Sequence, residues 1–404
     1  MQSESWRRNL YTIAIAEFLV IMGFSLYSPL LPIYMQKLGG LSSNEAALWS
    51  GIATGGSGLA MVISAPIWGT IADRWGRKPM LLRAQFGAAG VVALFLMAPN
   101  IYLLTGFRIV QGVFTGTVSA ASALVASCTP REKLPNSMGI LMGAIFAGQT
   151  VGPLAGGFLA DNFGYTVAFI VTSGLLASGG LIVLFLAREK FEKPTKSEHI
   201  LGKGLLRLAF SRQIFPLLLV LAALSIGPQI VSPVLPLIIA DLQPEGGAAS
   251  AAGQAFALLG VIAAASSLVF GRFNGRVSIR TILMVCCIGT GLLYLPSIWA
   301  NSALQLVLFF GFTGLLTGGI MTSSNSLVGL TVPASQQGIA YGLSQSATAL
   351  GAGLGPFLGG GLGAVMGLRY IFCISAVIFG LAGFLTYKLI PETLGKRNRS
   401  TTES

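Results

Sequence analysis

The stretch that decides the fold is residues 152–157, Gly-Pro-Leu-Ala-Gly-Gly. It returns at 355–360 as Gly-Pro-Phe-Leu-Gly-Gly, 203 residues further along the chain. A second marker, Ser-Pro-Leu-Leu-Pro at 28–32, returns as Ser-Pro-Val-Leu-Pro at 232–236, 204 residues later. The two markers keep their order and nearly the same offset, so the sequence predicts an internal duplication that covers the whole chain.

Composition places this duplication in a membrane. Of the 404 residues, 53% are hydrophobic and 9% are charged, and the mean hydropathy is +0.78, unlike soluble domains. Apolar blocks follow one another, each long enough for a helix to cross a hydrocarbon core about 30 Å thick. We expect twelve spans, at 10–34, 48–70, 80–98, 101–127, 137–160, 166–187, 213–240, 251–271, 279–299, 302–331, 336–361 and 368–389.

The number of spans per half sets the relation between the halves. Six is even, so both halves enter the membrane from the same side, and the repeat is parallel. We therefore predict an all-α integral membrane protein with twelve transmembrane helices in two parallel-repeat six-helix bundles. The expected domains are an N-terminal bundle at 1–187, a cytoplasmic linker at 188–212 and a C-terminal bundle with a cytoplasmic tail at 213–404.

Basic residues predict the orientation. With a cytoplasmic N-terminus, 22 of the 25 Lys and Arg fall in cytoplasmic segments or at the cytoplasmic ends of spans, as the positive-inside rule requires. We expect a multi-pass protein of the cell (inner or plasma) membrane with both termini in the cytoplasm, and we expect a monomer. The net charge of +12 is explained by topology and contact with anionic membrane lipid, so no nucleic acid partner is expected.

The residues that build most catalytic or metal centres are scarce. The one histidine, His199, lies in the linker, and the four cysteines show no paired metal spacing. We therefore expect no metal site, no cofactor and no catalytic residues, and we expect that the protein is not an enzyme.

The loop between the second and third spans, residues 69–79, reads Gly-Thr-Ile-Ala-Asp-Arg-Trp-Gly-Arg-Lys-Pro. Its spacing resembles the loop signature of the major facilitator superfamily. Glycine permits a tight turn there, the aspartate can bond nearby donors, and the basic residues can pair across an inner gate. A plain basic topology loop is the alternative. The motif residues are Gly69, Asp73, Arg74, Gly76, Arg77 and Lys78.

Two further motifs narrow the resemblance. Arg108-Ile109-Val110-Gln111-Gly112 in the fourth span is similar to a signature of proton-coupled drug antiporters. The fifth span resembles the glycine-proline signature of exporters in the same superfamily, through Gly148, Gly152, Pro153, Gly156 and Gly157. Close helix packing alone would also explain these glycines. Overall the chain is similar to the twelve-helix drug:proton antiporters, which include bacterial multidrug and tetracycline exporters, and this favours export over uptake.

Charged side chains inside a bilayer are costly, so embedded charges are candidates for function. Glu17 is the acid that lies well inside a predicted span, and Arg108 is read as the only embedded cation. Burial disfavours an ionised carboxyl, so we predict that Glu17 exchanges protons, and that a proton and a cationic substrate compete for it. Arg108 is predicted to tune this site without touching Glu17. The alternatives are a hydrogen-bonded structural carboxyl and a structural polar anchor.

Drug-binding cavities combine apolar and aromatic walls with a few polar anchors. Midspan residues that could supply both are Phe24, Tyr27, Phe146, Gln149, Gln229, Gln254, Phe256 and Asn325. The expected function is export of small amphipathic compounds, a multidrug efflux, in exchange for protons by alternating access. The alternatives are export of a specific metabolite, sugar or lipid on the same fold, and a membrane receptor or scaffold that transports nothing.

Overall fold

The computed structural model describes residues 2–189, 211, 214–273, 277–331 and 337–390, and this part of the chain is mostly helical. Asp73 and Asn325 lie in helices, but their side chains are outside the described set, as is Gly275 of the loop that repeats residues 69–79. The helices of the first half are α1 (Gln2–Tyr27), α2 (Leu30–Gly39), α3 (Ser43–Trp75), α4 (Arg77–Phe95), α5 (Ile101–Phe114), α6 (Thr117–Cys128), η1 (Arg131–Lys133), α7 (Leu134–Phe163) and α8 (Tyr165–Leu186).

The second half repeats this order from residue 214 onward. Its helices are α10 (Phe215–Val231), α11 (Leu235–Leu242), α12 (Ala248–Phe273), α13 (Ile279–Tyr294), η2 (Leu295–Trp299), α14 (Ala303–Phe312), α15 (Gly314–Thr331), α16 (Gln337–Met366), η4 (Leu368–Tyr370) and α17 (Ile371–Leu389).

The helix interruptions follow the duplicated sequence. The first and seventh spans are each split in two, at Ser28-Pro29 and at 232–234, where proline interrupts the backbone ladder. The fourth span breaks at Thr115-Gly116 and its repeat, the tenth, breaks at Thr313. Gly116 has φ +102°, a value that favours glycine. The two halves therefore repeat the same broken helices.

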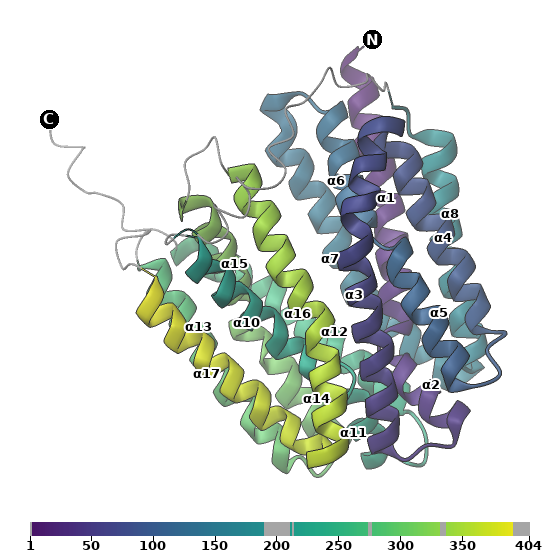
Figure 1. The fold of residues 1–404 in the computed structure, drawn as a ribbon, viewed down its shortest axis with the longest axis vertical. Helices are drawn as coiled ribbons and strands as arrows, with labels where there is room; N and C mark the ends of the chain where they lie inside the picture. The colour runs from purple at the N-terminus through teal and green to yellow at the C-terminus, as the bar shows by residue number, and fades with distance from the viewer. Residues whose placement is uncertain (1, 190–210, 212–213, 274–276, 332–336, 391–404) are drawn as a thin grey trace, which may run out of the picture.

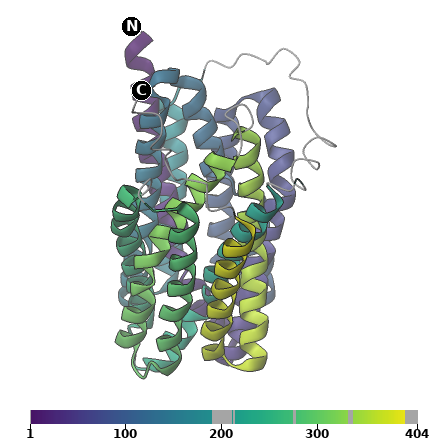
Figure 2. The same cartoon turned by 90° about the vertical axis from the view of Figure 1, so that its left-hand side faces the viewer.

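The helices form two bundles that lie side by side (Figures 1 and 2). Within the first bundle α1 packs against α7 and α8, and α4 lies between α5 and α8. Within the second, α10 packs against α16 and α17, and α12 against α14 and α15. The bundles meet along two seams, α3 with α16 and α7 with α12.

The two ends of the molecule differ. The bundles lean together where α2, α11 and α14 lie, which we call the closed end, and they diverge toward the end that carries the N-terminus, which we call the terminal end (Figure 1). At the closed end α2 contacts α11, and α11 also contacts α3.

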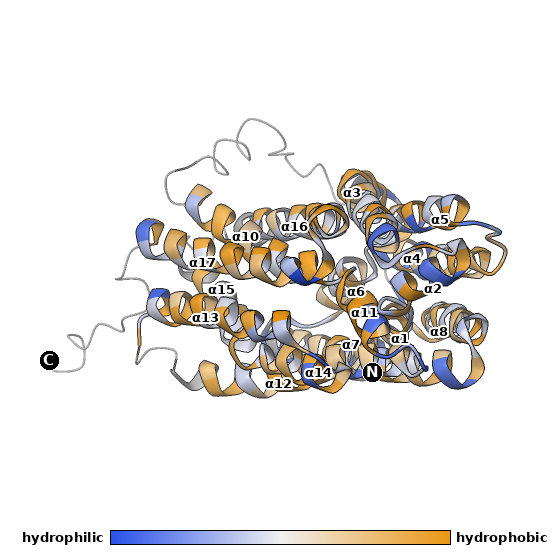
Figure 3. Cartoon of the chain, turned by 90° about the horizontal axis from the view of Figure 1, so that it is seen from below, coloured by the Kyte–Doolittle hydropathy of each residue, from blue (hydrophilic) through white to orange (hydrophobic). Residues whose placement is uncertain are grey.

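Eleven segments of the described chain are long and apolar enough to cross a membrane. The remaining expected span is α4, whose 19 residues form a helix with lower hydropathy because they include Arg77, Lys78 and Arg83. Large apolar side chains point outward on many helices: Phe185 is 74% exposed and Leu268 is 71% exposed. In Figure 3, seen along the helices, apolar colouring covers both bundles. This surface is explained by contact with lipid, and the protein is a multi-pass membrane protein.

Candidate functional site

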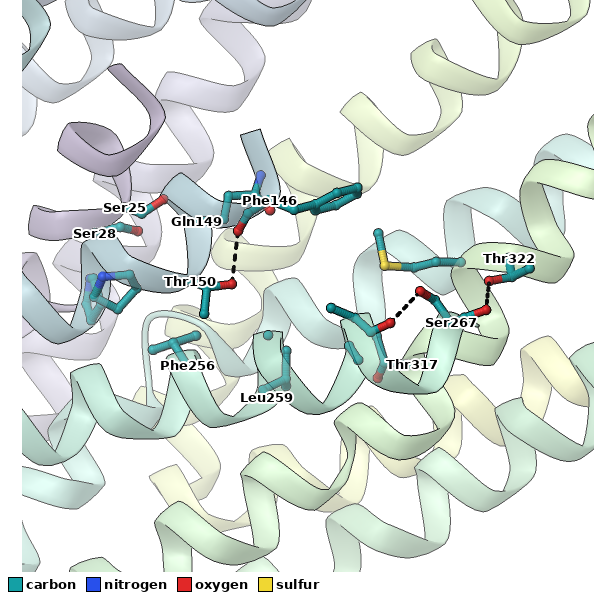
Figure 4. Close-up of a pocket in the computed structure, with 16 residues that line it drawn as sticks. Ser25, Ser28, Phe146, Gln149, Thr150, Phe256, Leu259, Ser267, Thr317 and Thr322 are labelled. Carbon is teal, nitrogen blue, oxygen red and sulfur yellow. Dashed lines mark hydrogen bonds between the residues drawn. The ribbon is translucent and has the colours of Figure 1, made fainter. Parts of the chain in front are cut away.

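A cavity of about 440 Å³ lies between the bundles, on the side of the α7–α12 seam (Figure 4). Its walls come from the junction of α1 and α2, from α7, from α12 and from α15. The volume falls within the range of small-molecule sites in proteins. Because both bundles supply walls, a movement of one bundle against the other would reshape the cavity.

Three of the predicted substrate residues line this cavity: Phe146 and Gln149 on α7, and Phe256 on α12. Phe146 is 46% exposed, so its ring is available to a ligand. The serine and threonine residues of the lining were not predicted, although Ser25, Ser28 and Thr150 each directly follow a predicted position. These lining residues are Ser25, Ser28, Thr150, Ser267, Thr317 and Thr322.

Four other predicted substrate residues do not line the cavity. Phe24 packs into the first bundle, and Tyr27 is 1% exposed and donates a hydrogen bond to Gln111 Oε1 at 2.7 Å. Gln229 faces Gly355 of α16, and Gln254 is exposed on α12 but is not part of the cavity lining. Their depth in the membrane was suitable, but the rotation of each helix turns them elsewhere.

Glu17 is fully buried inside the first bundle, and it does not line the cavity. Gln85 Nε2 of α4 donates to Glu17 Oε1 at 3.2 Å. The Thr117 hydroxyl of α6 also interacts with the Glu17 carboxyl. Glu17 Oε2 and Gln85 Oε1 are both buried acceptors that find no donor among the described residues. A proton on Glu17 would supply a donor to this pair.

Arg108 belongs to a different network, at the junction of α1 and α2. Its guanidinium donates to Gln111 Oε1 at 2.8 Å and to Ser57 Oγ at 2.9 Å. It also lies 5.6 Å from the centre of the Tyr27 ring, within reach of a cation–π interaction. Gln111 Oε1 thus accepts from both Arg108 and Tyr27, and it links α5 to the last turn of α1. This network shares no hydrogen-bonding residue with that of Glu17.

Arg83 is another basic residue inside a predicted span, the fourth residue of the span at 80–98. The Arg83 guanidinium lies 3.8 Å from the centre of the Trp68 ring. Arg83 and the Trp68 indole both donate to the Val113 carbonyl, at 3.1 and 2.8 Å. Val113 precedes the break in the fourth span, where the helix ladder ends, so these two donors stabilise the break.

The loop motif is held within the first bundle. Gly76 has φ +99° and separates α3 from α4. The backbone N–H groups of Arg77 and Lys78 each donate to the Glu189 carboxylate at 2.8 Å. A carboxylate at this position satisfies free N–H groups at the start of α4 and complements the helix dipole. Glu189 was not predicted as part of this site.

The basic side chains of the motif also bond inside the first bundle. The Arg77 side chain donates to Ala123 O at 3.0 Å, and the Lys78 ammonium donates to Leu184 O and Ala187 O at 2.8 and 2.7 Å. Arg74 is exposed, and a Cβ added to Gly69 would meet nothing within 4 Å. In this conformation Arg77 and Lys78 therefore hold α4 to α6 and α8.

The exporter motif packs α7 against two different helices. A Cβ on Gly156 would clash with the backbone of Leu26 in α1, inside the first bundle. A Cβ on Gly157 would lie 2.5 Å from Ala249 O of α12, in the second bundle. Gly148 and Gly152 also approach the α1 backbone, at 2.7 Å from Phe18 O and 2.5 Å from Met22 O for an added Cβ. Pro153 lies on the cavity wall.

The repeat of the motif does the same in the other seam. A Cβ on Gly359 would clash with the backbone of Ile230 in α10, and one on Gly360 would clash with Ala47 O of α3. Each glycine pair therefore packs against one helix of its own bundle and one helix of the other bundle.

Two polar contacts join the bundles near the closed end. Asp161 Oδ2 of α7 accepts a hydrogen bond from the Ser250 backbone N–H of α12 at 2.7 Å. Ser43 Oγ of α3 donates to Asp241 Oδ1 of α11 at 2.5 Å. Together with the two glycine pairs, these contacts hold the closed end together.

Comparison with known proteins agrees with this architecture. The sequence pattern of the Major Facilitator Superfamily matches residues 13–301 and 217–404. A multi-drug resistance efflux pump PmrA homolog from Lactococcus lactis subsp. lactis is 31% identical over 391 residues, which cover 95% of this chain and 96% of the relative. The multidrug resistance protein MdtG from Yersinia enterocolitica is 30% identical over 379 residues, covering 93% and 92%.

A solved structure shares the fold. It is a bacterial homolog of the human lysosomal transporter Spinster in an inward-facing and occupied conformation. It superposes with a TM-score of 0.80 at 14% identity, covering 96% of this chain and 97% of the other.

Proposed function

Because this chain belongs to the major facilitator superfamily, we propose that it exports small amphipathic compounds in exchange for protons by alternating access. The observation that carries the proposal is the cavity, because both bundles supply its walls. The contacts between the two bundles lie toward the closed end. Relatives named as multidrug efflux pumps, at about 30% identity along nearly the whole chain, support drug-like substrates and export. A transporter, and not an enzyme, is the class that these relatives indicate.

The proposed orientation places both termini in the cytoplasm of a cell with the protein in its inner or plasma membrane. The terminal end then faces the cytoplasm, and the closed end faces outward. Residues 1–187 and 213–404 act as two bundles, and residues 188–212 act as their tether. The protein works as a monomer in contact with anionic lipid, and its ligands are the substrate and the proton.

Proton binding is assigned to Glu17, with a change to the expected mechanism. The carboxyl is buried against α4 and α6, so a substrate in the cavity does not reach it. Proton and substrate therefore do not compete for the same oxygen atoms. Coupling runs through α1, which carries Glu17 in its middle and reaches the cavity at Ser25. The proton favours one arrangement of α1 and the substrate favours another.

Arg108 acts as a positioning residue for α1. It holds Gln111, which in turn holds the Tyr27 hydroxyl in the last turn before the α1–α2 junction. Ser28 and Pro29, the next residues, line the cavity. The network therefore connects the fourth span to the part of α1 that meets the substrate.

The experiment that tests the function is efflux from proteoliposomes with an imposed pH gradient, using a panel of amphipathic fluorescent compounds. Wild-type protein should move at least one compound against its gradient, and dissipating the pH gradient should stop this movement. Glu17→Gln keeps the shape of the side chain but cannot release a proton, so gradient-driven transport should fall at least tenfold while substrate binding changes little. Glu245→Gln, an exposed acid on the loop after α11, is the matched control.

Several outcomes would contradict the proposal. Transport that persists in Glu17→Gln excludes Glu17 as the coupling site. Transport at the same rate with and without the pH gradient excludes proton exchange. Transport of a sugar, a metabolite or a lipid, without transport of any drug-like compound, would favour the alternative cargo classes. Binding without movement of any compound would favour a receptor.

A further inference from the structure

The chemistry of the cavity lining indicates which amphipathic compounds the cavity can accept. We propose that this site, as the substrate site of the exporter proposed above, selects uncharged amphipathic compounds that carry hydrogen-bond donors. Two independent features of the lining carry the inference, its lack of charge and the orientation of its hydroxyl groups on α7, α12 and α15.

Among the residues that the structure describes, the lining of the cavity includes no acid and no base. Glu17, the buried acid of α1, lies eight residues before Ser25, about 12 Å along the helix, and its carboxyl is turned to Gln85. Asp161 is engaged with the Ser250 N–H group. A permanent cation in this cavity would lose its hydration and gain no opposite charge, which is strongly unfavourable in a low-dielectric site. An uncharged compound avoids this penalty.

The lining hydroxyl groups on α7, α12 and α15 have a common orientation. Thr150 donates to Phe146 O at 2.9 Å, Ser267 to Ala264 O at 2.7 Å and Thr317 to Thr313 O at 2.9 Å, each within one turn of its own helix. Thr322 likewise donates to Gly318 O at 2.9 Å. A hydroxyl has one hydrogen and two lone pairs, so each of these groups retains only acceptor capacity toward a ligand.

These acceptors come from three helices, α7, α12 and α15 (Figure 4). A ligand hydroxyl or amide N–H would find an acceptor on either bundle, whereas an ether or ester oxygen would find no donor among these four hydroxyls. The remaining walls include Phe146, Phe256 and Met321, which provide apolar contact, and methionine adapts to different shapes. The cavity therefore favours an aromatic body with a donor group.

Three probes with one scaffold separate charge from donor capacity: 9-anthracenemethanol, its methyl ether and 9-(aminomethyl)anthracene, which is cationic at neutral pH. Binding to purified protein in nanodiscs would be measured by fluorescence without any gradient, with empty nanodiscs as the partition background. The alcohol should bind about tenfold more tightly than the ammonium compound. It should also bind severalfold more tightly than the ether, as expected for one or two hydrogen bonds.

Thr150→Val and Thr317→Val keep the side-chain shape and remove the acceptors. Each should reduce the alcohol's advantage over the ether at least twofold, and the double variant should reduce it further. Thr386→Val is the matched control, because Thr386 makes the same bond to Ala382 O in α17, away from the cavity. Ammonium binding as tight as alcohol binding overturns the charge argument. An unchanged alcohol preference in the double variant overturns the acceptor argument.

The outcomes for selectivity and for function are distinct. If the protein binds the alcohol selectively but transports none of it in a pH gradient, the selectivity stands and the proposed function is contradicted. If the protein exports the ammonium compound in preference to the alcohol, the proposed function stands and the selectivity is contradicted.

Discussion

At the scale of single residues, the loop motif depends on a partner outside the motif. Glu189 lies two residues after the expected end of the first bundle, and its carboxylate receives the first N–H groups of α4. Asn9 holds the adjacent residue, since its side chain both donates to Arg188 O at 2.7 Å and accepts from Arg188 N at 3.0 Å. The start of the linker is thereby fixed to α1 and α4.

Replacing Glu189 by glutamine should lower the stability of the first bundle. Glutamine retains one acceptor but loses the charge that complements the α4 dipole, which is worth about 0.3–1 kcal/mol. Thermal unfolding in detergent should show a lower midpoint for Glu189→Gln. Glu132→Gln, an exposed acid in the short helix η1, should leave the midpoint unchanged. Equal midpoints for both variants would show that the cap contributes nothing.

At this scale the functional residue types could be predicted from the sequence, but their contacts could not. Glu17 and Arg108 could be singled out because charges in apolar spans are rare, and both occupy polar networks in the structure. Gln85, Thr117 and Glu189 could not be foreseen as partners, because each lies in a different helix or segment. Contacts between distant segments depend on the packing of whole helices, and no local pattern encodes them.

At the scale of helices, the duplicated motifs correspond to duplicated structure. The Ser-Pro markers break the first and seventh spans, and the Gly-Gly pairs place α7 and α16 against two helices each. Spans were predictable because hydropathy and length suffice to define them. The rotation of each helix about its own axis was not predictable. Gln254 and Phe256 are two residues apart, about 200° around the helix, and only Phe256 reaches the cavity.

A methyl group on Gly157 should keep the α7–α12 seam from closing. Its Cβ would lie 2.5 Å from Ala249 O, so α7 and α12 would separate at the closed end. We expect Gly157→Ala to bind substrate and to lose at least tenfold in transport. Spin labels across this seam should report a longer distance than in the wild type.

Gly139→Ala is the control for this substitution, since nothing lies within 4 Å of an added Cβ on that residue of the same helix. Wild-type transport in Gly157→Ala would show that close contact in this seam is not required for the cycle.

At the scale of the whole molecule, alternating access requires the closed end to open. The Ser43–Asp241 contact would have to break in every cycle. On a background in which the four cysteines are replaced, Ser43→Cys with Asp241→Cys should form a cross-link that stops transport, and reduction should restore it.

The control cross-link joins Gln36→Cys with Ser43→Cys, whose native side chains are also hydrogen-bonded, at 3.0 Å, but belong to the first bundle alone. Transport should continue with this cross-link in place. Continued transport with the Ser43–Asp241 cross-link formed would exclude opening at this end.

The uncharged lining of the cavity also has an electrical consequence. When one proton enters for each neutral molecule that leaves, the cycle carries one positive charge inward, and the membrane potential does work on it. A potential of about 100 mV contributes about 2.3 kcal/mol, and a pH difference of about one unit adds about 1.4 kcal/mol. Their sum, about 3.7 kcal/mol, can hold the exported compound at a concentration ratio of roughly 500. A cation exchanged for one proton would gain nothing from the voltage, so the absence of charge in the cavity would more than double the driving force.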